Sequence, residues 1–259
     1  MKKYVVVLGL LLQAPLSWAI SNIENERPNL PAPGLSGSIS IGLSGKTGNQ
    51  EEKNNEGGAK IIYRLDDEIF MALLEREYDT KLKIKTTDKS FLHARWVHLL
   101  TDRWASEAFA QREEDEFDNL TSRVLVGGGG RYMAAQKEDV YSLAFGLGAF
   151  HEVEKQNLVS YQETDRLWRL NTYYSYKYQL NTQVSLINTT YVQPSITDFG
   201  DFRVLFELGL NVKLINGLTL KVNYKLTHDS DPAKNLLVTP PIDNYKTNTE
   251  YQTALSYEF

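Results

Sequence analysis

The chain has 259 residues, of which 42% are hydrophobic and 24% charged, with a formal net charge of −5 and no cysteine. The absence of cysteine excludes disulfide scaffolds, thiol nucleophiles, cysteine-ligated zinc and iron–sulfur clusters, and the acidic balance argues against nucleic acid as a partner. The chain carries 15 Tyr, 10 Phe and 4 Trp, an aromatic content that has to be placed in any fold proposed for it.

Residues 1–19 have the parts of a secretory signal peptide. Lys2 and Lys3 form the positive start, an apolar run covers residues 4–12, and Ser17 and Ala19 supply the small residues of a cleavage site after Ala19. The apolar run is too short for a transmembrane helix, which needs about 20 residues. We therefore expect an exported protein, either soluble or crossing a membrane as a β-barrel.

Residues 20–33 form a polar stretch with Pro28, Pro31 and Pro33, which predicts an extended periplasmic lead-in without regular structure. From residue 34 to 259, apolar and polar residues alternate with a period of two, the pattern of β-strands with one face buried in an apolar medium. The expected strands are residues 35–43, 59–65, 68–78, 91–100, 104–112, 120–132, 141–151, 168–178, 182–192, 202–214, 218–226 and 245–259.

The connections between these strands alternate in length. Long connections are expected at residues 47–56, 79–90, 113–119, 152–164, 193–200 and 229–244, and short ones at 66–67, 101–103, 133–139, 179–181 and 215–217. Bacterial outer-membrane barrels have an even number of strands, short periplasmic turns and longer outer loops. The sequence therefore predicts an all-β fold, a transmembrane antiparallel up-and-down β-barrel of about 12 strands with both termini periplasmic. The alternative is a ten-stranded barrel in which residues 91–112 fold differently.

The last strand alternates Tyr251, Leu255 and Tyr257 with polar residues and ends on Phe259. This ending resembles the terminal signal of outer-membrane β-barrels, which implies the barrel assembly machinery as a partner during biogenesis. We expect deletion of Phe259 to leave export intact and to block membrane insertion, so that the protein is degraded in the periplasm.

Three stretches carry a family resemblance: residues 34–49, residues 104–132, and residues 228–232 together with Asp243. They resemble the YdiY-like family of salt-induced outer-membrane proteins, a family defined by a domain of unknown function. The resemblance implies location in the outer membrane of a Gram-negative cell, with lipids and lipopolysaccharide as surroundings. We expect no cofactor and no enzymatic activity, and a porin-like role as a narrow passive channel or as a plugged structural barrel that responds to osmotic stress, as the family name suggests. The oligomeric state stays open.

Few residues suggest catalysis. His228 and Ser230 are two positions apart and so share one face of a strand, where they could act as base and nucleophile of a lipid hydrolase. Ser230 is followed by Asp231-Pro232, and no orienting group is evident, so we expect a loop anchor and keep the hydrolase as the alternative function.

Acidic clusters at residues 113–118 and at Asp229, Asp231 and Asp243 are expected to be solvated loops, with divalent-cation binding as the alternative. The four glycines 127–130 are expected to allow a strand to bend or to approach another backbone closely, and not to bind phosphate.

Strand parity assigns a set of polar residues to the barrel lumen. Its main members are Arg123, Arg169, Arg203, Glu207, Lys221, Lys225 and Glu250. With the remaining inward positions, the expected cations outnumber the anions, so the interior is predicted to be basic. Such a lumen either fills with ion pairs and does not conduct, or conducts with a preference for anions. The remaining inward positions are Lys60, Arg64, Arg95, Arg131, Lys177, Lys213, Lys246, Glu75, Glu77, Glu107 and Glu258.

Overall fold

The structure is a computed structural model. It describes residues 22–27, 30–46, 52–117, 120–137, 140–157, 162–215, 217–232, 234–235, 242–243 and 245–258. Within these ranges no helix has the length and apolar character that crossing a membrane requires.

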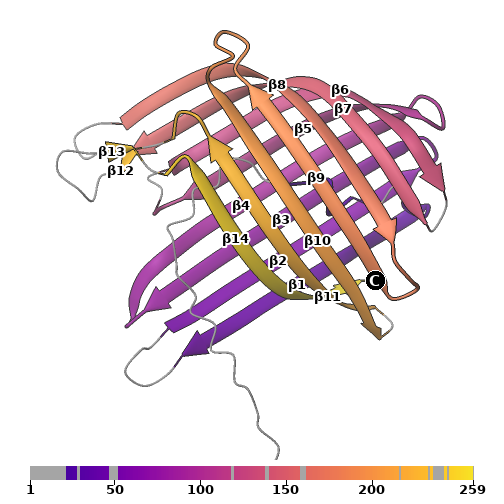
Figure 1. Ribbon diagram of the computed structural model, residues 1–259, viewed down its shortest axis with the longest axis horizontal. Helices are drawn as coiled ribbons and strands as arrows, with labels where there is room; N and C mark the ends of the chain where they lie inside the picture. The colour runs from indigo at the N-terminus through magenta and orange to yellow at the C-terminus, as the bar shows by residue number, and fades with distance from the viewer. Residues whose placement is uncertain are drawn as a thin grey trace, which may run out of the picture.

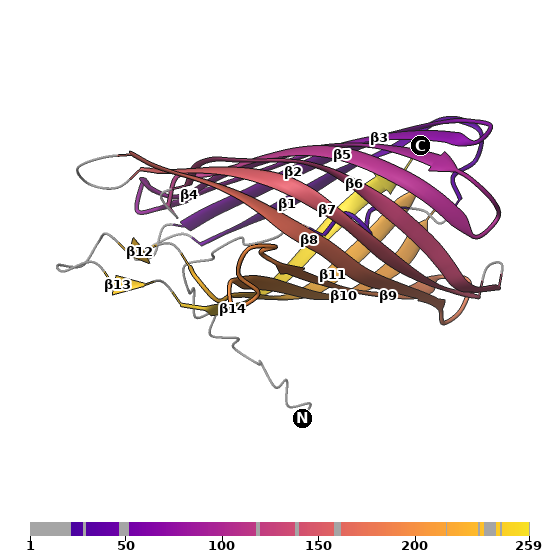
Figure 2. The same cartoon turned by 90° about the horizontal axis from the view of Figure 1, so that it is seen from above.

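The described chain is a closed antiparallel barrel in which each long strand pairs with the next and the last pairs with the first (Figures 1 and 2). This arrangement confirms the predicted up-and-down barrel of 12 strands and overturns the ten-stranded alternative. The barrel strands are β1 (Gly34–Lys46), β2 (Glu52–Leu65), β3 (Glu68–Lys81), β4 (Ile84–Leu99), β5 (Trp104–Asp115), β6 (Leu120–Lys137), β7 (Tyr141–Asn157), β8 (Gln162–Gln179), β9 (Val184–Pro194), β10 (Phe202–Ile215), β11 (Leu218–Asp229) and β14 (Thr247–Glu258).

The connection between β11 and β14 contains two further strands, β12 (Lys234–Asn235) and β13 (Ile242–Asp243), which pair with each other. We call the end of the barrel that bears this connection the outer end, and the end that bears the Asp66–Asp67 turn the inner end. β1 begins and β14 finishes at the inner end, so the barrel starts and closes on the same side (Figure 1).

The strands extend further toward the outer end than the sequence suggested. They are 11 to 18 residues long, whereas a tilted strand needs about 9–11 residues to cross a bilayer. Two expected long connections, at residues 79–90 and 152–164, are largely strand, and β5 extends to Asp115 within a third, at residues 113–119. Between β3 and β4 only Leu82 and Lys83 form the turn, with φ of 50° and 65°, the left-handed conformation that a two-residue hairpin uses. At the outer ends of the strands the outward side chains are polar, so the apolar band that faces lipid stops there. The backbone hydrogen bonds between strands continue beyond that point. The change to polar residues therefore does not mark where the strands end.

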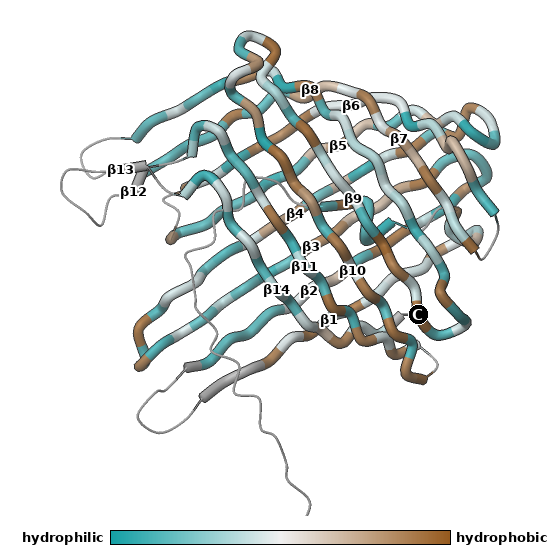
Figure 3. Tube along the Cα trace, viewed as in Figure 1, coloured by the Kyte–Doolittle hydropathy of each residue, from teal (hydrophilic) through white to brown (hydrophobic). Residues whose placement is uncertain are grey.

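Alternation gives the barrel an apolar outer surface, visible as alternating colours along the strands in Figure 3. Outward side chains such as Ile41, Leu147 and Tyr257 are 56%, 65% and 56% exposed. An outward apolar band of this kind is what lipid contact requires of a transmembrane barrel. The interior also holds an apolar cluster, which parity alone had not suggested. It consists of Ile23, Ile62, Ile69, Met71, Leu73, Phe91, Val97 and Ala105.

The four glycines 127–130 lie within β6, and their expected structural role is confirmed. A Cβ on Gly127 would lie 2.5 Å from the carbonyl oxygen of Ala149, and one on Gly129 would lie 2.4 Å from that of Leu147. These positions therefore tolerate no side chain where β6 and β7 come close.

Candidate functional site

The N-terminal residues 22–27, which we call the plug, lie inside the barrel. The backbone N–H groups of Glu24 and Asn25 donate to Oδ1 of Asn22 at 3.0 and 3.3 Å, and the N–H of Arg27 donates to the carbonyl oxygen of Glu24 at 3.4 Å. The side chain of Asn22 thus closes a compact turn. The sequence had suggested an extended periplasmic lead-in, and the structure differs because the charged side chains of this segment find partners in the lumen.

Glu24 is the centre of the plug and is fully buried. Its carboxylate lies 2.8 Å from Nη1 of Arg95 and 3.5 Å from Nη1 of Arg27, and it also pairs with Arg131. Burial alone would raise the pKa of Glu24, but the nearby arginines Arg131, Arg27 and Arg95 hold it well below its usual range. The plug therefore carries an ionised carboxylate at neutral pH.

Glu26 and Asn25 anchor the plug to a different part of the wall. Glu26 lies 3.0 Å from Nζ of Lys60 and 2.8 Å from Nζ of Lys221. Burial opposes ionisation of Glu26, yet these two lysines lower its pKa to about 2. Asn25 donates to Oε1 of Glu207 at 2.6 Å.

Further contacts complete the ring around the plug. Arg27 pairs with Glu107, its carbonyl oxygen accepts from Lys177, and Arg64 donates to the carbonyl oxygen of Pro31 at 2.8 Å. The partners come from β2, β4, β5, β6, β8, β10 and β11, strands from most of the barrel circumference. A segment held from so many strands lies across the lumen and narrows it.

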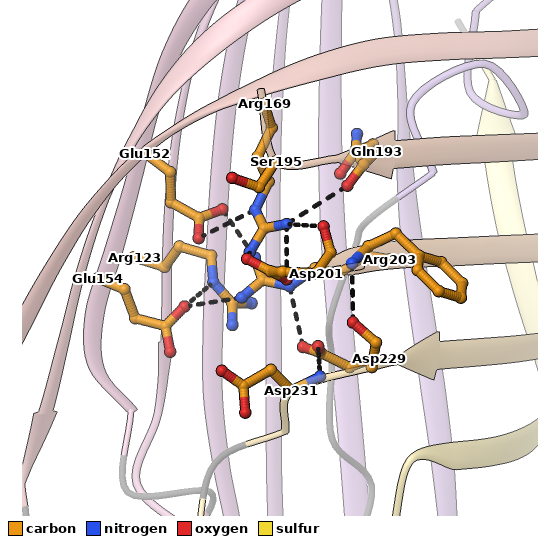
Figure 4. Close-up of polar contacts among 12 residues, drawn as sticks. Arg123, Glu152, Glu154, Arg169, Gln193, Ser195, Asp201, Arg203, Asp229 and Asp231 are labelled. Carbon is orange, nitrogen blue, oxygen red and sulfur yellow. Dashed lines mark hydrogen bonds and ion pairs between the residues drawn. The ribbon is translucent and has the colours of Figure 1, made fainter. Parts of the chain in front are cut away.

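A second group of ion pairs, the arginine cluster, joins strands to one another and to the connection between β9 and β10 (Figure 4). Arg203 on β10 lies 2.7 Å from Glu152 on β7 and 2.9 Å from Asp229 on β11. Arg123 on β6 lies 2.8 Å from Glu154 on β7. Arg169 on β8 contacts both carboxylate oxygens of Asp201, at 3.0 and 2.9 Å. All three guanidinium groups are buried and paired, so the cluster supports the wall and leaves no cation open for a ligand.

The expectation of a basic interior was wrong. Among the described residues, seven basic and eight acidic side chains are buried. The missed anions fall in two groups. The first was assigned to loops but occupies inward positions of longer strands, and Glu24, which belongs to the plug, is the second; the members of the first group are Glu113, Asp115, Glu152, Glu154 and Asp229. The signal that could have revealed the first group is that strand parity continues through the supposed loops.

The predicted lumen residues fall into three environments. Arg123, Arg169 and Arg203 form the arginine cluster, while Glu207 and Lys221 contact the plug. Lys225 stands opposite Glu207 in β10 and opposite Glu250 in β14. Lys213 and Lys246 are exposed, so they are not part of the buried interior. Lys60, Arg64, Arg95, Arg131, Lys177 and Glu107 contact the plug or Pro31 beside it, Glu75 and Glu77 line the cavity described next, and the side chain of Glu258 lies outside the described residues.

A cavity opens between the plug and one side of the wall, with an empty volume of about 1160 Å³ that communicates with solvent. We call it the outer cavity. It is lined by nine acidic and four basic residues, of which Glu114 and Arg76 sit at outward positions with side chains 40% and 53% exposed, so its electrostatic balance is the reverse of the predicted one. The acidic members are Glu26, Glu56, Glu75, Glu77, Glu113, Glu114, Asp115, Glu207 and Glu250, and the basic ones are Arg76, Lys89, Lys221 and Lys225.

The residues of the expected assembly signal lie on the outward face of β14. Tyr251, Leu255 and Tyr257 are 75%, 46% and 56% exposed. Phe259 lies outside the described residues. The described part of the signal is therefore placed where lipid or an assembly factor can reach it, while recognition by such a factor stays a prediction.

His228 and Ser230 make separate contacts. Nδ1 of His228 lies 2.8 Å from Oγ1 of Thr247, and its ring stacks on Phe202 with centroids 5.4 Å apart. Oγ of Ser230 accepts from the backbone N–H of Phe202 at 2.7 Å. In the described part of the chain no hydrogen bond joins His228 to Ser230, so the pair is arranged as a loop anchor and not as a base and nucleophile.

The acidic loops form no metal centre in the described residues, where no group of three or more His, Asp or Glu side chains has metal-binding geometry. Asp229 is buried against Arg203, while Asp118 and the side chain of Asp243 lie outside the described residues. The expectation of solvated loops therefore fails for Asp229, because it neutralises an arginine.

Comparison with solved structures finds other barrels. The NanC porin in a rhombohedral crystal form is 13% identical, with a TM-score of 0.51 over 86% of this chain and 100% of that one. The translocator domain of the autotransporter NalP from Neisseria meningitidis is 12% identical, with a TM-score of 0.52 over 87% of each chain. At these identities the similarity concerns the fold alone.

No curated protein matches this chain. A family profile described as "Protein of unknown function, DUF481" matches residues 39–259. The match supports the family resemblance at this broader level and leaves the YdiY-like subdivision as an expectation. Since the matched region is the barrel from the first strand to the last residue, the chain belongs to the DUF481 family.

Proposed function

We propose that this protein is a non-enzymatic, narrow passive channel of the bacterial outer membrane, exported with cleavage after Ala19 and closed by its own plug. The observation that carries the proposal is the docking of residues 22–27 across the lumen through Glu24 and Glu26. A barrel serving only as an envelope scaffold needs no separate segment inside it, since side chains from the strands can fill the interior.

The plug is held in a way that permits release. In the described chain its contacts with the wall are made by side chains and by single backbone carbonyls, without a β-ladder. Buried ion pairs give little net stability, because the cost of removing both charges from water offsets their attraction. Release would also expose Ile23, which is buried in the apolar cluster, so the docked state is favoured and openings are rare, as in a gate that is closed at rest.

The outer cavity sets the expected selectivity. Its acidic surplus attracts cations and lowers the concentration of anions at the outer side of the plug. Rings of acidic side chains are the usual basis of cation selectivity in pores. We therefore expect preference for small cations, in place of the anion preference suggested by sequence parity.

Planar-bilayer recordings test the proposal. The wild-type protein is compared with a variant in which residues 22–27 are replaced by a Gly-Ser segment of equal length, in symmetric and asymmetric potassium chloride. We expect rare, brief openings for the wild type, and a sustained conductance with a cation-selective reversal potential for the variant. A variant as silent as the wild type, with normal heat-modifiable migration on gels as proof of folding, would show that the plug is not a gate.

The control for charge alone is Glu163→Gln, which removes a carboxylate from an exposed position on β8 outside the outer cavity and leaves the plug untouched. Its conductance should equal that of the wild type. Equal opening in the control and in the plug variant would contradict the proposal.

A further inference from the structure

The junction between β1 and β14 is the weakest part of the barrel wall. Among the described residues, four pairs join these strands, from Ser38 opposite Glu258 to Ile41 opposite Leu255. By contrast, 13 residue pairs join β1 to β2 and 11 join β14 to β11. We call the β1–β14 junction the seam.

Toward the outer end the two edges of the seam separate (Figures 1 and 2). In the described chain, β1 beyond Ile41 pairs with β2 alone, and β14 before Leu255 pairs with β11 alone. Each unsatisfied backbone group exposed to hydrocarbon costs several kcal/mol, so such edges persist only where water or another polar partner reaches them. The adjoining outer cavity can supply that water, because residues of both edges line it.

Small side chains leave the lumen face of the seam open. Ser40 and Gly42 on β1 and Ala254 on β14 line the outer cavity. In the described part of the chain, one side-chain hydrogen bond spans this opening, from Nε2 of Gln252 to Oε2 of Glu56 at 2.9 Å. A Cβ on Gly42 would come 2.9 Å from the same Oε2, so the absence of a side chain at Gly42 makes room for this contact. A polar group entering from the membrane side meets one replaceable hydrogen bond and no packed barrier.

The two sides of the seam offer different chemistry. On the lipid side, Leu43 and Tyr251 are 74% and 75% exposed, an apolar lining suited to an alkyl chain. On the lumen side, Glu56, Glu77 and Glu250 line the cavity directly behind the opening. Charge complementarity therefore favours a molecule with a cationic head and an alkyl tail.

We propose that the seam is a lateral portal between the outer cavity and the membrane, and that it admits single-chain cationic amphiphiles of the alkylammonium class. The head enters the acidic cavity while the tail stays between the exposed apolar residues of β1 and β14. This route bypasses the plug, so it does not depend on the plug acting as a gate.

Disulfide cross-linking tests the opening, and the absence of native cysteine gives a clean background. In a fully paired seam, Leu43 would stand opposite Thr253, two positions beyond the pair of Ile41 and Leu255. The variant L43C/T253C should cross-link at least tenfold more slowly than I41C/L255C under mild oxidation in liposomes. A second control, L43C/N55C, joins residues that are paired between β1 and β2 and should cross-link as fast as I41C/L255C.

Quenching tests the occupant. A bimane label on A254C is exposed to a nitroxide-labelled octadecyltrimethylammonium or to nitroxide-labelled stearate, and each result is divided by quenching of A94C, a lipid-facing position on β4. The normalised quenching by the ammonium probe should exceed that by stearate at least threefold. The double variant Glu56→Gln/Glu77→Gln should remove this difference.

The two assays separate the outcomes. Equal cross-linking of L43C/T253C and I41C/L255C would overturn the portal, because it would show a closed seam. Slow cross-linking with equal quenching by both probes would overturn the cationic occupant. Heat-modifiable migration verifies that each variant is folded.

Discussion

The plug and the arginine cluster use the same chemistry for different ends. In the arginine cluster, Arg203 pairs with carboxylates of β7 and β11, so these ion pairs join strands that backbone ladders already hold. In the plug, Glu24 brings a carboxylate to arginines of the wall on a segment that no described ladder supports. The comparison teaches that the mechanical role of an ion pair depends on what else holds its two ends.

Both groups are desolvated to a similar degree, since Glu24 is 0% and Arg169 2% exposed. Breaking such a buried pair by removing one partner costs about 3–5 kcal/mol. Where ladders hold both ends, this cost lowers the stability of the barrel. Where one end belongs to a docked segment, the segment can leave the lumen and so avoid this cost. Removing one partner then raises the population of the open channel and leaves the stability of the barrel nearly unchanged.

The largest expected effect follows from Glu24→Gln. The substitution leaves Arg95 and Arg131 facing a neutral amide, and a loss of about 3 kcal/mol from the docked state raises the released population more than 100-fold. Single-channel recordings should show an open probability increased by about that factor. The unfolding midpoint should stay close to that of the wild type, because the barrel ladders are unchanged.

The corresponding change in the arginine cluster is Glu152→Gln. Glu152 lies 2.7 Å from Arg203 and 3.7 Å from Arg169, so its neutralisation leaves two buried guanidinium groups short of a partner. We expect the free energy of unfolding to fall by about 3 kcal/mol, measured by urea titration with gel migration as the readout, and the conductance to stay at the wild-type level. Channel opening in Glu152→Gln without loss of stability would remove the distinction between the two groups.

The sequence predicted the barrel well because period-two alternation reports directly on a wall with lipid on one side. Strand number, antiparallel order and closure all followed from that one signal. The outer ends of the strands were predicted poorly because alternation continues in water without apolar residues to mark it. For this reason Glu113 and Glu154 were assigned to loops, although both are inward and buried.

The plug could not be predicted from periodicity, because a six-residue turn between the expected signal peptide and the prolines has no repeat. Its sequence, Asn-Ile-Glu-Asn-Glu-Arg, contains the needed charges, but their value depends on lysines and arginines contributed by distant strands. The sequence did contain one signal for the plug, the excess of cations over anions among the residues assigned to the lumen. Unpaired buried charge is costly, so such an excess indicates that further anions enter the lumen.

A smaller effect is expected from pH. The pKa of Glu26 is about 2 in the docked plug against an ordinary value of 4.5, so docking favours the ionised form. The stabilisation is fully present above the ordinary pKa and is lost as pH falls toward the lowered one. The open probability should therefore stay constant from pH 7 to about pH 5 and rise progressively below it. A rise between pH 7 and pH 6 in bilayer recordings would indicate that another group controls the plug.

Glu26→Gln should sharpen this result. It removes the titrating carboxylate while leaving Glu24 in place, so the acid-induced rise should weaken and begin at lower pH. Because the side chains of Glu26, Lys60 and Lys221 are 19%, 13% and 13% exposed, solvent screens these pairs more than those of Glu24. We expect opening at neutral pH to increase less than tenfold, below the effect of Glu24→Gln.

The smallest effect is expected outside the lumen, at the outward pair of Arg112 and Glu114. Their side chains are 59% and 40% exposed and 2.6 Å apart, a geometry as close as that of the buried pairs. Exposed ion pairs contribute about 0–1 kcal/mol, because water already stabilises each charge. Arg112→Ala should change neither the conductance nor, beyond about 0.5 kcal/mol, the free energy of unfolding. A larger loss of stability would mean that distance alone, and not burial or backbone support, determines what an ion pair does in this barrel.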